Sequence, residues 1–414
     1  MSLSIYNLAL YFYYFAIVCY SMFNKKAKLW IYGRKQTQYL VDTYGLNEFK
    51  GAILCHASSL GEFEQLRPLI ERIKTSHPQE KIIVSFFSPS GFEVRKNYEL
   101  ADKVLYLPFD QKKQIQSFLA QLLPKVIIIV RYEFWINTIT TAKQLNIPIF
   151  LIAASFRKEQ IFFRFYGSIF KKLLLCYQQI FVVQSNNIEL LQQIGISTVT
   201  FAPDTRIDRV VSIAVQQKEI PLITLFLENT ECSIVAGSTW DSDLAVILPY
   251  IHLYPNKKYI IAPHHIDEKS LIEIESKLTI PNIRYSKLSD NFTKGTNVLI
   301  IDNFGMLVSL YSYGKFAYIG GGFGSSVHNA LEAVVYKKPV FFGPHYKKAI
   351  ECINLIELQA AYCVLTSSSL STKIALLESS EIAYNEVSHR AYHYIETNKG
   401  GSEIIYKYIL PFLA

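Results

Sequence analysis

Short runs of apolar, β-branched residues recur along this chain and alternate with helical patterns. In the first half they lie at residues 52–55, 82–86, 104–106, 126–130, 149–152 and 180–183. In the second half they lie at 233–236, 258–262, 297–301, 316–319 and 339–342. Helical stretches such as 61–76 and 111–123 separate them. Fully apolar runs of this length between helices predict α/β architecture, with parallel strands covered by helices on both faces.

The alternation pauses between about residues 207 and 230, and 414 residues are too many for one ordinary core. We therefore expect two Rossmann-like, doubly wound domains, at 35–206 and 233–414, joined by a linker at 207–232. Residues 1–34 form a separate apolar segment with a basic flank. Ligands of such sheets bind beyond the carboxyl ends of the strands. Those ends are expected to face each other across a cleft.

Residues 1–24 contain no Asp, Glu, Lys or Arg, and their centre at 8–20 is strongly apolar. The basic residues Lys25, Lys26, Lys28, Arg34 and Lys35 follow. This pattern predicts a membrane-associated helix with the body of the protein on the cytoplasmic side of the inner membrane. Its tyrosines suit an interfacial position as well as a full span. An apolar helix docked on the first domain is the alternative.

The net charge of +8 favours an anionic partner, such as a phosphorylated substrate or an anionic membrane face. No nucleic-acid-binding module is present in the sequence. The six cysteines are scattered without a CxxC pair, which predicts reduced thiols and neither a zinc site nor a disulfide framework.

The glycine-rich segment 320–326 follows the apolar run 316–319 and precedes a helical pattern at 330–336. A glycine turn between strand and helix exposes backbone N–H groups that attract phosphate. Gly321 and Gly322 are therefore candidate phosphate-binding residues. Glu332 is expected one turn into the helix, within reach of a sugar hydroxyl. A packing turn without a ligand would have a similar sequence.

Two acidic motifs follow strands of the first half. Ser58, Ser59 and Gly61 open a helix with Glu62 in its first turn. Glu62 is a candidate general base for an incoming hydroxyl, although a helix dipole alone also favours a carboxylate there. Glu133 lies among aromatic residues in the segment 131–135. It is a candidate for binding an acceptor sugar or orienting a base, with a structural ion pair as the rival interpretation.

Three further motifs hold candidate anion ligands. Arg206 either binds a substrate phosphate or pairs with a neighbouring aspartate. Ser238 and Thr239 follow the first strand of the second half, and their hydroxyl groups suit phosphate oxygens. His264 is a candidate donor to an anion. Metal binding by the adjacent histidines is not expected, because no third ligand of suitable spacing is present.

Taken together, these motifs resemble the 3-deoxy-D-manno-octulosonic acid (Kdo) transferase family. The resemblance runs from the apolar N-terminus to about residue 351 and depends on the order and spacing of its motifs, at 56–62, 132–135, 204–209, 237–240, 262–265, 320–332 and 342–345. It implies a GT-B glycosyltransferase that moves Kdo from CMP-Kdo to a lipid A precursor of the lipid IVA type in lipopolysaccharide biosynthesis. It implies inversion, and no metal or other cofactor, since CMP-Kdo is a co-substrate.

By position in the motifs, the resemblance makes Glu62 the catalytic base and Glu133 the second acidic residue of an acidic-x-acidic-x-Trp motif. The residues that match the CMP-binding loop and helix are Gly321, Gly322, Asn329 and Glu332. Two departures are evident: Arg131 stands where many members have an acidic residue, and His264 stands where the family usually has arginine.

Two alternatives remain open at the level of sequence. One is a different GT-B enzyme that uses a UDP-sugar, or a sugar-nucleotide epimerase. The other is an inactive, membrane-tethered binding protein.

Overall fold

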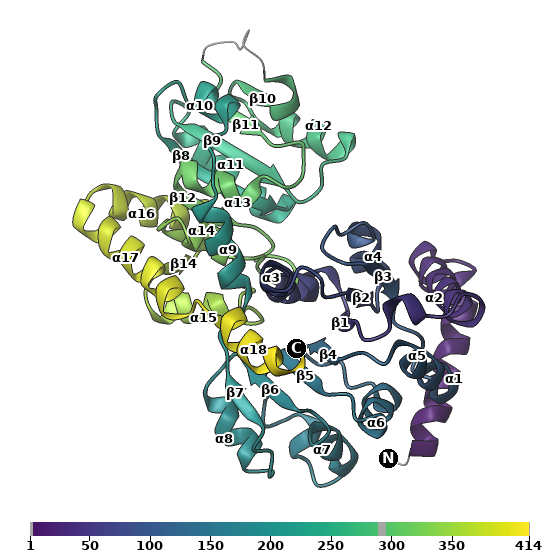
Figure 1. Cartoon of the computed structure of the whole chain (residues 1–414). Coiled ribbons are helices and arrows are strands. Elements are labelled where there is room, and N and C mark those ends of the chain that lie inside the picture. The colour runs from purple at the N-terminus through teal and green to yellow at the C-terminus, as the bar shows by residue number, and fades with distance from the viewer. Residues whose placement is uncertain (1–2, 289–294, 414) are drawn as a thin grey trace. The chain divides into compact units, whose positions relative to one another are not determined.

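The computed structural model describes residues 3–288 and 295–413. The chain divides into two compact units, which are considered one at a time (Figure 1). The first unit comprises Met1–Arg209 and Lys399–Ala414, and the second comprises Val210–Asn398.

The first unit contains a parallel sheet of seven strands in the order β3-β2-β1-β4-β5-β6-β7. Its strands are β1 (Ile53–Ala57), β2 (Ile82–Phe86), β3 (Lys103–Tyr106), β4 (Val126–Val130), β5 (Ile149–Ala154), β6 (Gln179–Val182) and β7 (Val199–Phe201). Its helices are α1 (Leu3–Ser21), α2 (Lys25–Thr43), α3 (Leu60–Ser76), α4 (Pro89–Arg95), α5 (Lys112–Leu122), α6 (Ile136–Gln144), α7 (Ser168–Leu174), α8 (Asn186–Gln192) and α18 (Gly401–Ile409). This strand order is the doubly wound Rossmann order, as expected.

Alternate residues of these strands face two separate apolar cores, as the two-residue period of a strand requires. Leu54 and Ile127 belong to the core beneath α5, α6 and α7. Ile53 and Ile128 belong to the core beneath α3 and α18. Both faces of the sheet are therefore buried, which explains why its strands are apolar throughout.

The second unit contains a second parallel sheet of seven strands, in the order β10-β11-β9-β8-β12-β13-β14. Its strands are β8 (Cys232–Thr239), β9 (Lys258–Pro263), β10 (Asn282–Arg284), β11 (Val298–Ile300), β12 (Gly314–Ile319), β13 (Val340–Phe342) and β14 (Ala361–Cys363). Its helices are α10 (Pro221–Leu227), α11 (Asp241–Leu253), α12 (Glu268–Lys277), α13 (Leu307–Leu310), α14 (Leu331–Val334), α15 (Ile350–Glu357), α16 (Ser367–Glu378) and α17 (Glu381–Thr397), and α9 (Arg206–Val215) joins the two units.

The boundaries expected for the second domain are wrong at its end. The segment Lys399–Ala414 belongs to the first unit, where Ile405 and Ile409 of α18 enter the core beneath the first sheet. Asp208 helps to hold this C-terminal segment on the first unit. Its carboxylate accepts hydrogen bonds from the backbone N–H groups of Gly400 (2.5 Å) and Ser402 (2.7 Å) at the start of α18. The expected linker at 207–232 is largely helical, since it holds most of α9 and all of α10.

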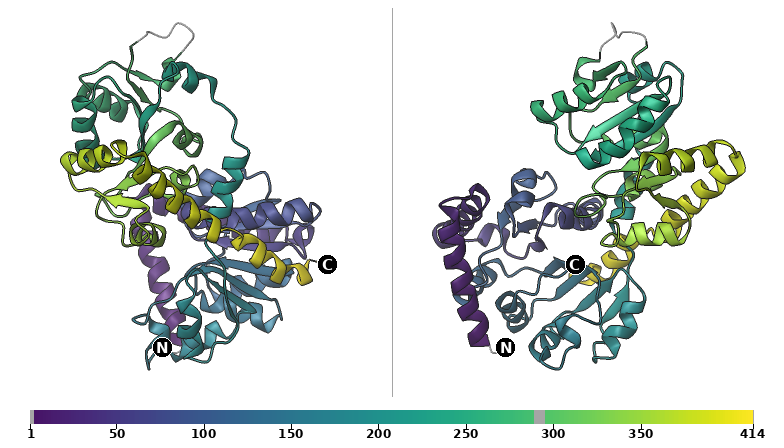
Figure 2. Two further views of the ribbon diagram at one scale, coloured as in Figure 1. Left: turned by 90° about the vertical axis from the view of Figure 1, so that its left-hand side faces the viewer. Right: turned by 180° about the vertical axis from the view of Figure 1, so that it is seen from behind.

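Helix α1 lies along the side of the first unit and next to α2 (Figure 2). Leu10 packs with Trp30 and Phe109 in a small apolar cluster. The hydroxyl of Tyr6 donates a 2.6 Å hydrogen bond to the buried carboxylate of Asp110. The opposite face of α1 is exposed and apolar, with Ile5, Leu8, Tyr11, Phe12, Phe15 and Val18. Helix α1 is also long enough and apolar enough to cross a bilayer.

Candidate active site

Each sheet has one point where the order of its strands reverses, and the candidate residues gather there. In the first sheet β1 and β4 are neighbours; Glu62 lies in the first turn of α3, shortly after β1, and Glu133 lies in the loop after β4. In the second sheet β8 and β12 are neighbours; Ser238 lies near the end of β8, and the glycine-rich turn follows β12. Ligands of open α/β sheets bind at such switch points.

Glu62 is held at the first turn of α3 by the chain that precedes it. The backbone N–H of Ser58 donates a 2.6 Å hydrogen bond to Oε2 of Glu62. Burial raises the pKa of Glu62 to about 7, with the nearby Glu133 as a further cause, and the hydrogen bond from Ser58 opposes this shift. A carboxylate with a pKa near neutral pH is well matched to accept a proton from a hydroxyl.

Glu133 lies near the same loop. Its Oε2 is 4.0 Å from Nε2 of His56, and its side chain is 15% exposed. Burial raises the pKa of Glu133. His56 is not a cationic partner, because burial, together with Arg34, lowers the pKa of His56 to about 3. The structure thus brings Glu62, Glu133 and Ser58 together without forming the structural ion pair that was the rival interpretation for Glu133.

Arg131 and Arg206 belong to a polar network around Gln65. Nε of Arg131 donates to Oε1 of Gln65 over 2.6 Å, and Nε2 of Gln65 donates to Oδ2 of Asp204 over 3.1 Å. The guanidinium of Arg206 binds the carboxylate of Asp204 at 2.8 Å. Burial opposes ionisation of Asp204, but Arg206 outweighs it and lowers the pKa of that carboxyl. Arg206 therefore has a protein partner within the structure.

The glycine-rich turn of the second unit is packed backbone to backbone against its neighbours. A Cβ at Gly322 would lie 2.5 Å from the backbone N of Gly343, and one at Gly320 would lie 2.1 Å from the carbonyl oxygen of Ser238. Gly321 has φ +87°, in the left-handed region that favours glycine. These three glycines are required by the structure itself, whatever ligand the turn binds.

The expected helix at 330–336 is shorter in the structure, where α14 covers only Leu331–Val334. A helix of one turn supplies little dipole, so α14 itself contributes little to binding a phosphate. The turn offers backbone donors instead: within the described part of the chain, nothing accepts from the N–H groups of Gly322, Ser325 and Ser326. Unpaired backbone N–H groups in one turn are available as donors to an anion.

Asn329 and Glu332 lie together after the turn, where Nδ2 of Asn329 donates to Oε1 of Glu332 over 3.0 Å. Oδ1 of Asn329 is buried and has no hydrogen-bond partner among the described residues, and neither has the buried Oγ1 of Thr239. Buried polar atoms without partners are uncommon and frequently mark a place where a ligand completes the hydrogen bonding.

Asp243 is a residue that the sequence reasoning missed. It is fully buried and its carboxylate accepts hydrogen bonds from the N–H groups of Gly321 (2.9 Å) and Trp240 (2.9 Å) and from the hydroxyl of Tyr318 (3.1 Å). It thereby ties the glycine-rich turn to the start of α11. Its sequence signal is a carboxylate at the third position of a helix that follows a strand, a common capping pattern.

His264 belongs to a stack of aromatic rings at the same edge of the sheet. Its ring stacks with that of Trp240 (centroids 4.3 Å apart) and with that of His328 (4.8 Å). Nε1 of Trp240 donates to Nε2 of His328 over 3.1 Å. Burial and the neighbours His328 and His265 lower the pKa of His264, so it is neutral at pH 7. No cluster of three or more metal-ligating side chains is found among the residues that the structure describes.

Replacing His264 with arginine is expected to strengthen nucleotide binding. His264→Arg introduces a cation that is charged at every pH, and a guanidinium can also stack on Trp240. Titration calorimetry at pH 8 should give a Kd for CMP that is several-fold lower than that of the wild type. His389→Arg, an exposed change on α17 of the same unit, is the control for added charge. Equal Kd values for His264→Arg and wild type would contradict a phosphate next to His264.

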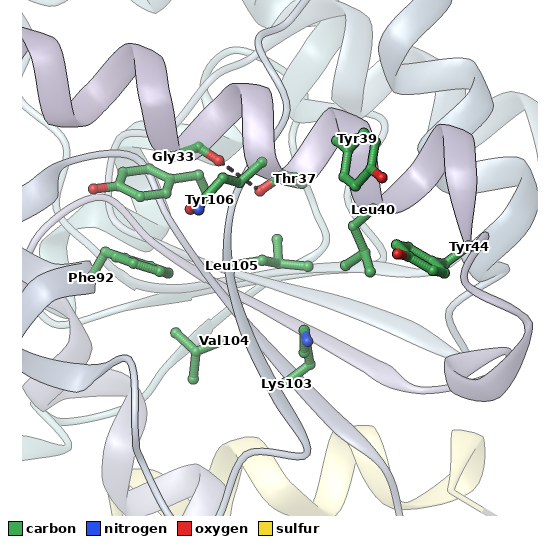
Figure 3. Close-up of a pocket in the computed structure, with 11 residues that line it drawn as sticks. Gly33, Thr37, Tyr39, Leu40, Tyr44, Phe92, Lys103, Val104, Leu105 and Tyr106 are labelled. Carbon is green, nitrogen blue, oxygen red and sulfur yellow. Dashed lines mark hydrogen bonds between the residues drawn. The ribbon is translucent and has the colours of Figure 1, made fainter.

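A separate groove of about 340 Å³ lies between α2 and the edge strand β3 (Figure 3). Its walls are mostly apolar, with Leu40, Phe92, Val104, Leu105 and Tyr106. Figure 3 shows Tyr39 and Tyr44 beside it, and Lys103 is its one charged lining residue. The groove lacks the convergent polar groups that a nucleotide requires.

Known proteins resemble this chain over most of its length. Residues 26–209 match the family model of 3-deoxy-D-manno-octulosonic-acid transferase (kdotransferase). The chain is 27% identical over 340 residues to the 3-deoxy-D-manno-octulosonic acid transferase of Aquifex aeolicus, covering 80% of this chain and 87% of that protein. It is 25% identical over 375 residues to the transferase of the same name from Haemophilus influenzae, covering 87% of each.

Solved structures share the architecture. UDP-GlcNAc 2-epimerase from Neisseria meningitidis aligns with a TM-score of 0.61 at 16% identity, covering 87% of this chain and 100% of that one. MurG from Acinetobacter baumannii aligns with a TM-score of 0.51 at 11% identity, covering 87% and 99%. These likenesses show the GT-B type of fold, in which two Rossmann-like domains follow each other. In sequence, the chain is similar to 3-deoxy-D-manno-octulosonic acid transferases over 80–87% of its length.

Proposed function

We propose that this protein transfers Kdo from CMP-Kdo to a lipid A precursor of the lipid IVA type, with inversion and without a metal. The observation that carries this proposal is the carboxylate of Glu62, which lies at a sheet switch point with its pKa raised to about 7. Similarity to 3-deoxy-D-manno-octulosonic acid transferases supports Kdo as the transferred group.

On the first unit, Glu62 acts as the general base. The hydrogen bond from the backbone N–H of Ser58 fixes one carboxylate oxygen, which leaves the other to accept the proton of an acceptor hydroxyl. Glu133 lies close enough to raise the pKa of Glu62 by its like charge. We assign Ser59 and Gly61, at the start of α3, to the acceptor site; a Cβ at Gly61 would meet nothing within 4 Å, so this approach is open.

On the second unit, the unpaired N–H groups of the glycine-rich turn bind the donor phosphate, together with the Ser238 hydroxyl and His264. They stabilise the negative charge that grows on the departing CMP. The buried, unpartnered oxygens of Thr239 and Asn329 are available to hydroxyl or amino donors of the nucleotide. Arg206 belongs to the first unit, where Asp204 is its partner.

We further propose that α1 holds the protein at the cytoplasmic face of the inner membrane by lying in the interface. Tyr6 and Leu10 attach one face of α1 to the first unit, and the other face is apolar and exposed. A helix held along its length in this way suits an in-plane position better than a span.

Charges placed on the exposed face of α1 are expected to release the protein from membranes. Phe12 and Phe15 are each 67% exposed. The double variant Phe12→Glu/Phe15→Glu should lower partitioning onto anionic phospholipid vesicles at least tenfold, because it removes two apolar contacts and adds negative charge. The control is Phe304→Glu/Ile382→Glu on the second unit, where both residues are exposed. Unchanged vesicle binding of the α1 variant would contradict the assignment.

The direct test of the proposed function is mass spectrometry of the product formed by the purified full chain from CMP-Kdo and a lipid A precursor. A mass increase by Kdo residues supports the proposal and also counts them. Competition between CMP and UDP for binding separates a CMP-Kdo enzyme from an epimerase or a UDP-sugar transferase of the same fold. Binding of CMP without any product would indicate the inactive binding protein.

A further inference from the structure

An open groove of about 510 Å³ lies beside the glycine-rich turn of the second unit. This volume is within the range of pockets for small organic ligands. The groove is lined by Gly324, Ser325, Pro344, His345, Lys347 and Lys348. Three of these side chains carry nitrogen, and none is acidic, so the lining favours a negatively charged ligand.

Two loops form the groove, and the fold fixes them to each other. One is the glycine-rich turn after β12, and the other follows the neighbouring strand β13. The backbone N–H of His345 donates to the carbonyl oxygen of Gly322 over 2.7 Å. Nδ1–H of the same histidine donates to the carbonyl oxygen of Gly324, also over 2.7 Å. A ligand on the turn therefore has the second loop as a fixed neighbour.

Lys347 and Lys348 are exposed and have no ion-pair or hydrogen-bond partner within the described part of the chain. Two other lysines of this unit have carboxylate partners: Nζ of Lys257 lies 2.7 Å from a carboxylate oxygen of Glu378, and that of Lys277 lies 2.6 Å from one of Glu273. Two adjacent ammonium groups on a wall without an acid concentrate positive charge at that place.

We propose that Lys347 and Lys348 bind the carboxylate of the donor's sugar acid, and that the groove thereby selects a sugar acid over neutral sugars. This inference rests on the proposed function, because it takes the unpaired N–H groups of the glycine-rich turn as the phosphate site. A sugar joined to that phosphate extends into the adjoining groove, where its carboxylate meets the two ammonium groups. A neutral sugar leaves both of them without a partner, which discriminates against it.

The test compares a ligand that has the carboxylate with one that lacks it. KM for CMP-Kdo and Ki for CMP are measured with the full chain and with Lys347→Gln/Lys348→Gln. We expect KM to rise at least tenfold and Ki to change less than twofold. The matched control is Lys269→Gln/Lys287→Gln, which removes the same charge from two other exposed positions of this unit.

The outcomes separate this inference from the proposed function. Equal increases in KM and Ki would overturn the inference, because they would place the lysines on the phosphate or show a general charge effect. An unchanged KM would overturn it too, while transfer by the wild type would leave the proposed function standing. A wild-type chain that neither binds CMP nor forms product would overturn the proposed function, and this inference with it.

Discussion

Glu62→Gln is expected to lower kcat for transfer by about 10²–10⁴, the usual contribution of a general base. Glutamine keeps an oxygen that can accept the hydrogen bond from the backbone N–H of Ser58, so acceptor KM should change little. In the wild type, kcat/KM should rise with pH through about 7, since only the ionised carboxylate takes a proton. A variant with near-normal turnover would remove Glu62 from the role of base.

The same substitution is expected to stabilise the first unit. A pKa raised from 4.5 to about 7 means that the folded state binds this proton more tightly than the unfolded state does. Stability is therefore lost as pH rises from about 4.5 to 7, and the loss above pH 7 is about 3 kcal/mol at most. Glu62→Gln should recover much of it at pH 8 and almost none at pH 4.

Urea titration at the two pH values measures this gain. In a Trp240→Phe background the remaining tryptophans, Trp30 and Trp135, both report on the first unit. The control is Glu64→Gln, two residues further along α3. The carboxylate of Glu64 is paired with the guanidinium of Arg95 at 2.7 Å. If the free energy of unfolding at pH 8 were equal for wild type and Glu62→Gln, the raised pKa of the buried Glu62 carboxyl would be contradicted.

Asp243→Ala is expected to disrupt the donor site of the second unit. Three buried donors, on Trp240, Gly321 and Tyr318, lose their acceptor, and the cost is about 3 kcal/mol. Because Gly321 then loses its attachment to α11, the Kd for CMP should rise at least tenfold. Trp240 fluorescence measures the unfolding of this unit, and calorimetry measures CMP binding.

Asp241→Ala is the matched control for this change. Asp241 lies in the first turn of the same helix, but its side chain is 70% exposed and pairs with Lys277 at 3.4 Å. It should change stability by less than about 1 kcal/mol, as exposed ion pairs do. If both alanine variants were equally stable and bound CMP equally well, the role of Asp243 in holding the turn would be wrong.

The sequence predicted the interior of both sheets well because burial on two faces makes central strands uniformly apolar. It missed β10 and β14, which are three-residue edge strands with polar or small residues such as Asn282 and Ala361. Edge strands have one neighbour and less burial, so they carry little periodic signal. The placement of Lys399–Ala414 was missed for another reason, since an amphipathic helix does not identify the sheet that it covers.

Local signals placed Glu62, Glu133 and the glycine-rich turn directly after strands, and the structure shows that these strands meet at the switch points of the two sheets. Asp243 and His328 were not found, because their roles depend on contacts across adjacent loops. His328 stacks on His264 and accepts from Trp240, which are far from it in sequence. The length of α14 was overestimated, because residues 330–336 include good helix formers but only Leu331–Val334 are helical in the structure.

The capping of α18 by Asp208 has a consequence for biosynthesis. The second unit is an insertion between Arg209 and Lys399 of the first, so the first unit is discontinuous along the chain. During translation, one side of its sheet, with Phe150 and Phe181, has no α18 over it until residues 399–413 leave the ribosome. One apolar face of the nascent first unit therefore stays exposed while the ribosome synthesises the whole second unit.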